Sequence, residues 1–207
     1  MPVFAGSDLP VKELGWADMY TPMGITGVTM YLTGEAAVNP QIPAISLPFT
    51  MCHEMAHRMC IAREDDANFA AFLACQAHSK AEFQYSGYFM AYAYCIRALN
   101  QLSPQTAQQI IGGQNTLLTR DIAAYDGFFR DNKDKKAEKL SDSINDLYLK
   151  ASGDEDGAES YAKVYELLVS WYIQEVVLPQ QTVDEEPAFD PYDEAWVTRT
   201  IPTEANG

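Results

Sequence analysis

The spacing of apolar and polar residues differs between two parts of the chain, and the two spacings predict different secondary structures. Residues 24–39 are rich in β-branched and aromatic side chains, and Thr33-Gly34 divides them in the middle. This pattern predicts a β-hairpin, because Gly in a tight turn lets two short strands pair. Before the hairpin, a short helical turn is expected within residues 11–19.

Beyond a Pro-containing connection, apolar residues recur at the spacing of three and four that is typical of helices. Pro104, Gly112-Gly113 and Ser152-Gly153 interrupt this pattern. We expect helices at about residues 49–61, 64–79, 82–102, 104–112, 116–132, 135–151 and 158–178. The fold class is therefore predicted as α+β and mainly α, with a small N-terminal hairpin or sheet and a C-terminal helical bundle.

Composition indicates one folded domain followed by an acidic tail. The chain has 207 residues, of which 47% are hydrophobic, enough for one core. We assign residues 1–180 to this domain. Residues 181–207 are acidic, interrupted by Pro and poor in aliphatic side chains, which predicts a mobile tail.

The balance of charge excludes one class of partner. The 29 acidic residues outnumber the 14 basic ones, and no Lys or Arg cluster is present to neutralise phosphates. Nucleic acid is therefore not an expected partner. The longest apolar run, residues 89–96, is shorter than the roughly 18 to 20 residues that span a bilayer, so the chain as given is expected to be soluble.

Four cysteines lie at irregular spacings inside apolar, helical segments: Cys52, Cys60, Cys75 and Cys95. No C-x-x-C pair suggests a cysteine metal site or a redox motif. We expect buried thiols and no disulfide framework.

Residues 53–57, His-Glu-Met-Ala-His, match the metal-binding pattern H-E-x-x-H. On a helix, His53 and His57 point the same way one turn apart, so two imidazoles can share one metal ion. Glu54 is rotated by about 100° around the helix, which lets its carboxylate reach a metal-activated water as a general base. The pattern alone is only moderately specific, so a third ligand is needed.

Glu64 is the predicted third ligand. It begins the sequence Glu-Asp-Asp-Ala-Asn, and many zinc peptidases with a glutamate ligand carry E-x-x-A-D or E-x-x-A-N in the helix after the first motif. On one unbroken helix, Glu64 would lie roughly 10 Å along the axis from His57, too far for a shared ion. We therefore predict that the helix ends between Arg58 and Arg63 and that the chain turns back, although neither Gly nor Pro marks the break.

Other candidate ligands rank below this set. The pattern H-E-x-x-H-x-x-G-x-x-H is excluded, because Cys60 and Arg63 occupy its Gly and third His positions. Asp65 and Asp66 are competing carboxylates. His78, the only other histidine, is interpreted as an ordinary helix-end or surface residue.

Three further polar residues have open roles. Asn68 lies one helical turn beyond Glu64, where it either orients a ligand or packs as an ordinary amide. Tyr85 and Tyr88 can donate a hydrogen bond to an oxyanion, but aromatic packing is the favoured interpretation. Neither tyrosine is predicted to be catalytic.

Five segments form a wider pattern around the motif: Gly24-Ile25-Thr26-Gly27, residues 33–39, Pro48-Phe49-Thr50, residues 62–69 and Tyr85-Ser86-Gly87-Tyr88. Together they resemble the bacterial domain of unknown function 3810 over about residues 20–102, with a weaker echo near Ser160-Tyr161 and Leu167-Leu168. His78 and the tail depart from that family's pattern. The family is regarded as zinc peptidases, and its members commonly carry transmembrane helices ahead of this domain. The resemblance implies that this chain is the soluble part of a membrane-anchored bacterial protein.

The predicted function is a zincin-like metallopeptidase of the gluzincin type, which hydrolyses a peptide or protein substrate and binds one Zn²⁺ ion. Two imidazoles and a carboxylate leave one coordination position for water, whose pKa falls to roughly 7. Glu54 takes the proton and passes it to the leaving amine. The hairpin is a candidate edge to which an extended peptide adds as a further strand. Ligands of this kind also suit several other metal ions.

Two other functions compete with this hypothesis. One is a non-catalytic domain that keeps zinc for stability or binds peptides without cleaving them. Glu54 argues against it, because a structural site has no use for a base. The other is a helical interaction module at a membrane, in which the histidines are incidental.

Overall fold

The predicted hairpin forms, and a third short strand joins it. The computed structural model describes residues 9–132, 134 and 163–180. Strand β2 (Gly27–Met30) pairs antiparallel with β3 (Glu35–Val38), and Gly34 turns the chain between them with a φ of 69°. Strand β1 (Lys12–Glu13) pairs in parallel with β3, which gives the order β1-β3-β2.

The helical turn expected within residues 11–19 is confined to the end of that segment. Lys12–Glu13 is a strand, and helix α1 (Ala17–Tyr20) begins only afterwards, followed by the 3-10 turn η2 (Thr21–Met23). The edge of β3 explains the difference, because it supplies hydrogen-bond partners to the earlier segment, and Lys12 forms an ion pair with Glu35. Local periodicity does not reveal such a contact.

Helices make up most of the described structure, so the predicted class of a mainly α, α+β fold is confirmed. Their bounds are α2 (Leu47–Arg58), α3 (Glu64–Gln76), α4 (Ala81–Leu102), α5 (Pro104–Gly112), α6 (Thr116–Asn132) and α8 (Val164–Tyr172), which continues into the π-helical turn η4 (Ile173–Val177). The predicted helix at residues 135–151, the first residues of that at 158–178 and the tail at 181–207 lie outside the described residues. Contacts between Cα atoms divide the chain into two units, Met1–Leu168 and Val169–Gly207.

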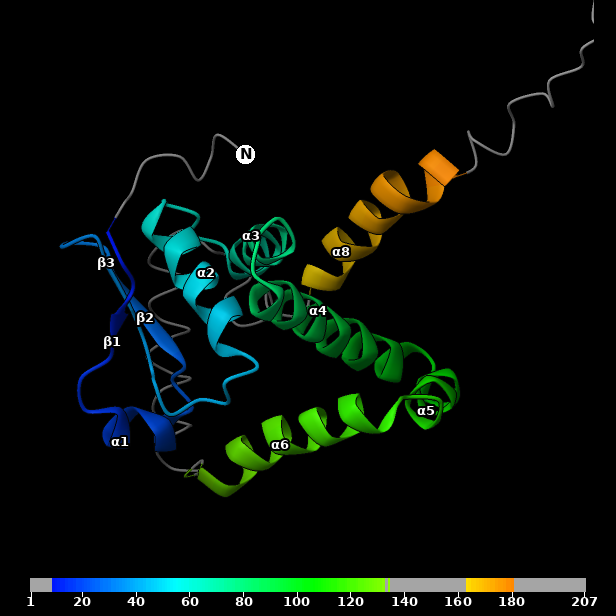
Figure 1. Ribbon diagram of the computed structural model, residues 1–207, viewed down its shortest axis with the longest axis horizontal. Coiled ribbons are helices and arrows are strands. Elements are labelled where there is room, and N and C mark those ends of the chain that lie inside the picture. Colours follow the sequence, from blue (N-terminus) through cyan, green and yellow to red (C-terminus); the bar gives the residue numbers. More distant parts are fainter. Residues whose placement is uncertain (1–8, 133, 135–162, 181–207) are drawn as a thin grey trace, which may run out of the picture. The chain divides into compact units, whose positions relative to one another are not determined.

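Helix α2 is central to the first of these units. It contacts β2 and β3 as well as α3 and α4 (Figure 1). Its N-terminus is capped from α4, where the fully buried Ser86 accepts a hydrogen bond at Oγ from the Phe49 N–H at 3.0 Å. The first N–H groups of a helix have no partner within the helix, and Pro48 has no N–H to satisfy. The bond to Ser86 pairs the Phe49 N–H, which would otherwise be a buried donor without a partner.

Asn39 fixes the point where the chain leaves the sheet. The residue is fully buried, and its Nδ2 donates to Thr21 Oγ1 at 2.9 Å and to the Ile25 carbonyl at 3.1 Å. Its Oδ1 accepts from the Gln41 N–H at 3.0 Å. A buried amide with these bonds satisfied favours one arrangement of the surrounding loops over others.

Helices α3 and α4 approach each other closely at Gly87. A Cβ at that position would lie 2.6 Å from the Cys75 Cβ, a distance that real side chains do not tolerate. Cys75 in turn contacts Cys52, with 3.7 Å between the sulfur atoms, and both thiols are buried and free. The prediction of buried thiols holds for this pair but is wrong for Cys60, which is exposed because it lies in the turn after α2.

Helix α2 ends in a Schellman motif. The Cys60 N–H donates to the His57 carbonyl at 2.9 Å, and the Ile61 N–H donates to the Ala56 carbonyl at 3.2 Å. Cys60 has a φ of 67°, the left-handed conformation that Gly usually adopts at this position. Ile61 then packs on a cluster of buried alanines: Ala56, Ala67 and Ala70. These contacts reverse the chain without Gly or Pro.

No helix within residues 9–132 and 163–180 is long and apolar enough to cross a bilayer. Anchoring of a parent protein through other segments stays a prediction.

Gly87→Ala is expected to destabilise the fold by about 1–3 kcal/mol, because the added methyl group overpacks the contact with Cys75. Gly127→Ala in α6 is the matched control, since a Cβ there would meet only Arg130 Nη2 at 3.5 Å. The control should stabilise by up to about 1 kcal/mol through helix propensity. Urea unfolding of both variants measures the difference, and equal stability of the two would contradict the close packing.

Cys60→Gly is expected to stabilise the fold by about 0.5–1 kcal/mol, because Gly adopts a positive φ without the strain that a Cβ causes. The side chain is exposed, so little packing is lost. Cys60→Ala removes the thiol but keeps the Cβ, and its thermal midpoint should stay near that of the wild type. A Gly variant no more stable than the Ala variant would show that the turn is unstrained.

Candidate metal centre

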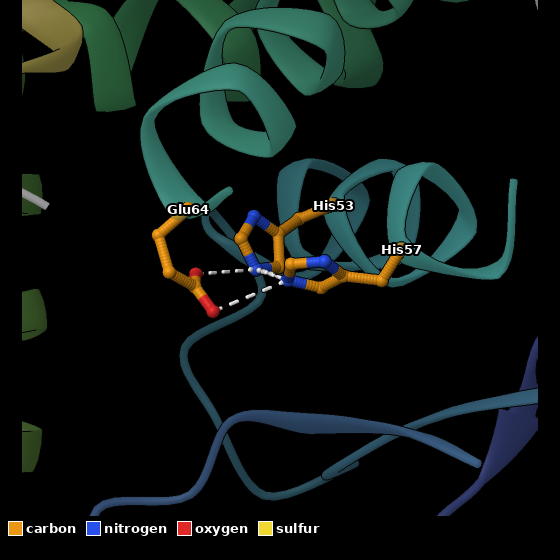
Figure 2. A group of neighbouring side chains, drawn as sticks. All are labelled: His53, His57 and Glu64. Atoms are coloured by element: carbon orange, nitrogen blue, oxygen red, sulfur yellow. Dashed lines mark hydrogen bonds and ion pairs between the residues drawn. The ribbon is translucent and has the colours of Figure 1, made fainter. Parts of the chain in front are cut away.

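Three side chains converge at the junction of α2 and α3. His53 and His57 extend from α2 and Glu64 from the first residue of α3, all pointing toward one another (Figure 2). The two Nε2 atoms are 3.0 Å apart. Glu64 Oε2 lies 3.4 Å from His53 Nε2, and Glu64 Oε1 lies 3.4 Å from His57 Nε2.

The predicted break in the helix makes this convergence possible. Helix α2 ends at Arg58, and α3 begins at Glu64 after the chain has reversed through Cys60. A carboxylate that an unbroken helix would place about two turns from His57 is thereby returned to the imidazoles. The position of the break agrees with the interval between Arg58 and Arg63 that a shared ion requires.

The tautomer of His57 is set by the same turn. Its Nδ1 lies 2.8 Å from the Ile61 carbonyl oxygen, which can only accept, so Nδ1 carries the proton. Nε2 of the neutral ring then presents its lone pair to the centre. A main-chain carbonyl in this role is a common outer partner of metal-binding histidines. His53 Nδ1 is buried and has no hydrogen-bond partner among the described residues.

The centre attracts positive charge. Burial raises the pKa of Glu64, but the hydrogen bonds from His53 and His57, with their charges, lower it to about 2. Burial lowers the pKa of His57, yet the hydrogen bond and charge of Glu64 outweigh this effect, and the pKa is raised. An ionised carboxylate facing two imidazoles therefore favours a cation between them, either a proton or a metal ion.

The ligand atoms of the three side chains lie close enough to share one metal ion. For zinc bonds of about 2.0–2.1 Å to nitrogen and oxygen, the edges of a tetrahedron are about 3.3–3.4 Å long. The two Nε2 atoms are 3.0 Å apart, and each lies 3.4 Å from a different oxygen of Glu64, distances near these edges. One ligand atom from each of the three side chains lies within 4.8 Å of the other two. His53, His57 and Glu64 could thus hold a metal ion, and they form such a group within the described part of the chain.

Glu54, the predicted base, is buried against strand β2. Its Oε2 accepts a hydrogen bond from Thr29 Oγ1 at 2.7 Å, and its Oε1 lies where a Cβ of Gly27 would be, at 2.4 Å. Burial raises the pKa of this carboxyl, while the charge of His53 and the Thr29 hydroxyl act in the opposite direction. Sequence reasoning assigned no role to Thr29 or Gly27, because a contact across 25 residues leaves no local signal.

The competing carboxylates are engaged elsewhere. Asp65 accepts two hydrogen bonds from Arg63, at 3.2 and 2.9 Å, and Asp66 Oδ2 lies 3.7 Å from the same guanidinium. Asn68 is buried and its Oδ1 accepts from the Tyr94 hydroxyl at 3.1 Å. The partner of Oδ1 is thus a residue of α4, while Nδ2 is buried and has no hydrogen-bond partner among the described residues. Both roles of Asn68, packing and ligand orientation, stay predictions.

The remaining candidates are His78, Tyr85 and Tyr88, whose contacts are with aromatic rings, a carboxylate and a main-chain N–H. His78 follows α3, stacks on Phe83 at 3.9 Å between ring centroids, and accepts from the Lys80 N–H, as an ordinary helix-end residue does. Tyr85 donates to Asp121 at 2.8 Å and is 45% exposed. Tyr88 packs edge-on against Phe72. The ring contact of Tyr88 fits the packing interpretation, whereas Tyr85 is a surface residue held by its hydrogen bond to Asp121.

Comparison with known proteins identifies the family. No curated protein and no solved structure matches the chain. A family model described as "Protein of unknown function (DUF3810)" matches residues 1–169, a longer stretch than the predicted 20–102. The match includes His53, His57 and Glu64, although the description names no activity. The chain therefore belongs to this family of unknown function, the domain of unknown function 3810.

Proposed function

We propose that this chain is a zinc-dependent metallopeptidase. One observation carries the proposal: two imidazole nitrogens 3.0 Å apart each face an oxygen of the Glu64 carboxylate at 3.4 Å, and the ligand atoms of the three side chains lie within 4.8 Å of one another, close enough to share one ion. Two imidazoles and a carboxylate are a ligand set found in catalytic zinc sites. Three protein ligands are the usual number in catalytic zinc sites, whereas structural sites have four. Within the described residues, the competing carboxylates of Asp65 and Asp66 are paired with Arg63.

His53, His57 and Glu64 would hold the ion, and Glu54 would act as general base. Bound zinc supplies Lewis acidity, which acidifies water and polarises a carbonyl. Glu54 Oε1, the oxygen that Thr29 does not engage, accepts the proton of the attacking water and delivers it to the departing amine. The low exposure of Glu54, 5%, limits competition from bulk solvent.

Strand β2 supports a peptide as the substrate. It lies at the edge of the sheet, and within the described residues no strand pairs with its outer side. An extended peptide can add to such an edge through main-chain hydrogen bonds, whatever its sequence. The same strand carries Thr29 and Gly27, which contact Glu54, so a peptide added here lies beside the proposed base.

A non-catalytic, zinc-containing peptide-binding domain is the second candidate. The contact of Glu54 with Thr29 favours it, because this hydrogen bond gives the glutamate a packing role that a domain without activity would also keep. The presence of Glu54 is therefore weaker evidence for catalysis than the H-E-x-x-H pattern alone indicates. Comparing metal content with activity separates the two candidates.

Protein purified without added metal is expected to contain about one zinc per chain, measured by atomic emission, and the double variant His53→Ala, His57→Ala should contain almost none. Asp66→Asn, a change at a half-exposed neighbouring carboxylate, is the control that keeps its zinc. Chelation of the wild type should lower its thermal midpoint, since an ion bound only by the folded state stabilises it. Equal metal contents in the wild type and double variant would refute the site.

Glu54→Gln is expected to keep the zinc and to lose peptide hydrolysis by about 10²–10⁴-fold, because an amide cannot accept the proton. Cleavage of unfolded, fluorescently labelled casein measures the loss. A variant as active as the wild type would rule out Glu54 as the base. Zinc-loaded wild type that binds peptides but cleaves none would favour the non-catalytic candidate.

A further inference from the structure

Strand β2 confines the Glu54 carboxylate at both of its oxygens. Thr29 Oγ1 lies 2.7 Å from Glu54 Oε2 and 2.9 Å from the Glu54 carbonyl oxygen. Gly27, two residues earlier and on the same face of the strand, leaves the space that Oε1 occupies. The carboxylate thus receives a hydrogen bond and a steric limit from one strand.

The Thr29 hydroxyl has one proton and two acceptors within reach. Hydrogen bonds to an ionised acceptor are roughly twice as strong as those between neutral groups, so when Glu54 is ionised, as a general base must be, the hydroxyl donates to the carboxylate in preference to the carbonyl. This bond fixes Oε2, while Oε1, beside Gly27, is the oxygen that Thr29 does not engage.

We propose that Thr29 is a positioning residue for Glu54, an inference that rests on the peptidase function proposed above. A general base works only when its accepting atom lies within hydrogen-bond reach of the proton donor. Glutamate has a long and flexible side chain, so a base of this type needs neighbours that restrict its rotamers. Thr29 restricts it through the hydrogen bond, and Gly27, which has no Cβ, admits Oε1 at this position.

Packing of α2 on β2 does not by itself need a hydroxyl at position 29. Val has the same branched shape as Thr and favours strands as strongly. Both acceptors within reach of the Thr29 hydroxyl belong to Glu54, one in its side chain and one in its main chain. The hydroxyl is therefore the part of Thr29 that acts on the base, and it can be removed while the shape is kept.

Casein hydrolysis by the zinc-loaded full chain tests this role. Thr29→Val is expected to lower kcat by about 10- to 100-fold, as misplaced catalytic groups do, with KM and zinc content unchanged. Thr29→Ser keeps the hydroxyl and should restore most of the lost kcat. Thr33→Val makes the same chemical change in the exposed turn of the hairpin and should leave kcat at the wild-type value.

A second measurement does not depend on turnover. A small hydroxamate chelates zinc and has N–H and O–H donors for a neighbouring carboxylate, so its dissociation constant should rise about tenfold or more in Thr29→Val and little in Thr29→Ser. Equal hydroxamate affinity and equal kcat in the wild type and Thr29→Val overturn the positioning role and leave the peptidase function intact. Weakened hydroxamate binding in a chain that cleaves no peptide supports the positioning contact and rejects the peptidase function.

Discussion

The chain reverses between His57 and Glu64, through the left-handed Cys60 and the extended Arg63. This reversal brings the Glu64 carboxylate within 3.4 Å of the His57 imidazole. The other contacts of the centre depend on this reversal. A helix that continued past Arg58 would carry the carboxylate away along its axis, and the imidazoles would have no third partner. The strain of a positive φ at Cys60 is offset by two main-chain hydrogen bonds and by the burial of Ile61 on the alanine cluster.

Helix α2 is held at both ends and along its side by segments that are distant in sequence. Ser86 of α4 caps its start, the turn after Arg58 closes its end, and β2 contacts Glu54 between them. Gly27 and Gly87 serve the same purpose at two places, because each removes a Cβ that would displace a neighbour. Strands β2 and β3 and helices α3 and α4, which carry most of the segments typical of the family, all contact α2 and hold it in place.

Local pattern is sufficient to predict the hairpin, most of the described helices and the convergence of His53, His57 and Glu64, which could hold a metal ion. The spacing of His53 and His57 follows from one helical turn, and the position of the helix break follows from the reach of a shared ion. By contrast, the hydrogen bond from Thr29 to Glu54 and the cap that Ser86 provides depend on how β2 and α4 pack on α2. Strand β1 was missed for the same reason, since two residues have too little periodicity to distinguish a strand from a turn.

The contact between His57 and Ile61 makes one part of the centre insensitive to point mutation. The acceptor is a main-chain oxygen, which every amino acid at position 61 would supply. Substitutions there can alter packing on the alanine cluster, but they cannot remove the atom that selects the histidine tautomer. Substitutions at position 61 are therefore limited by side-chain volume and hydrophobicity. Which nitrogen of His57 carries the proton depends instead on the conformation of the main chain.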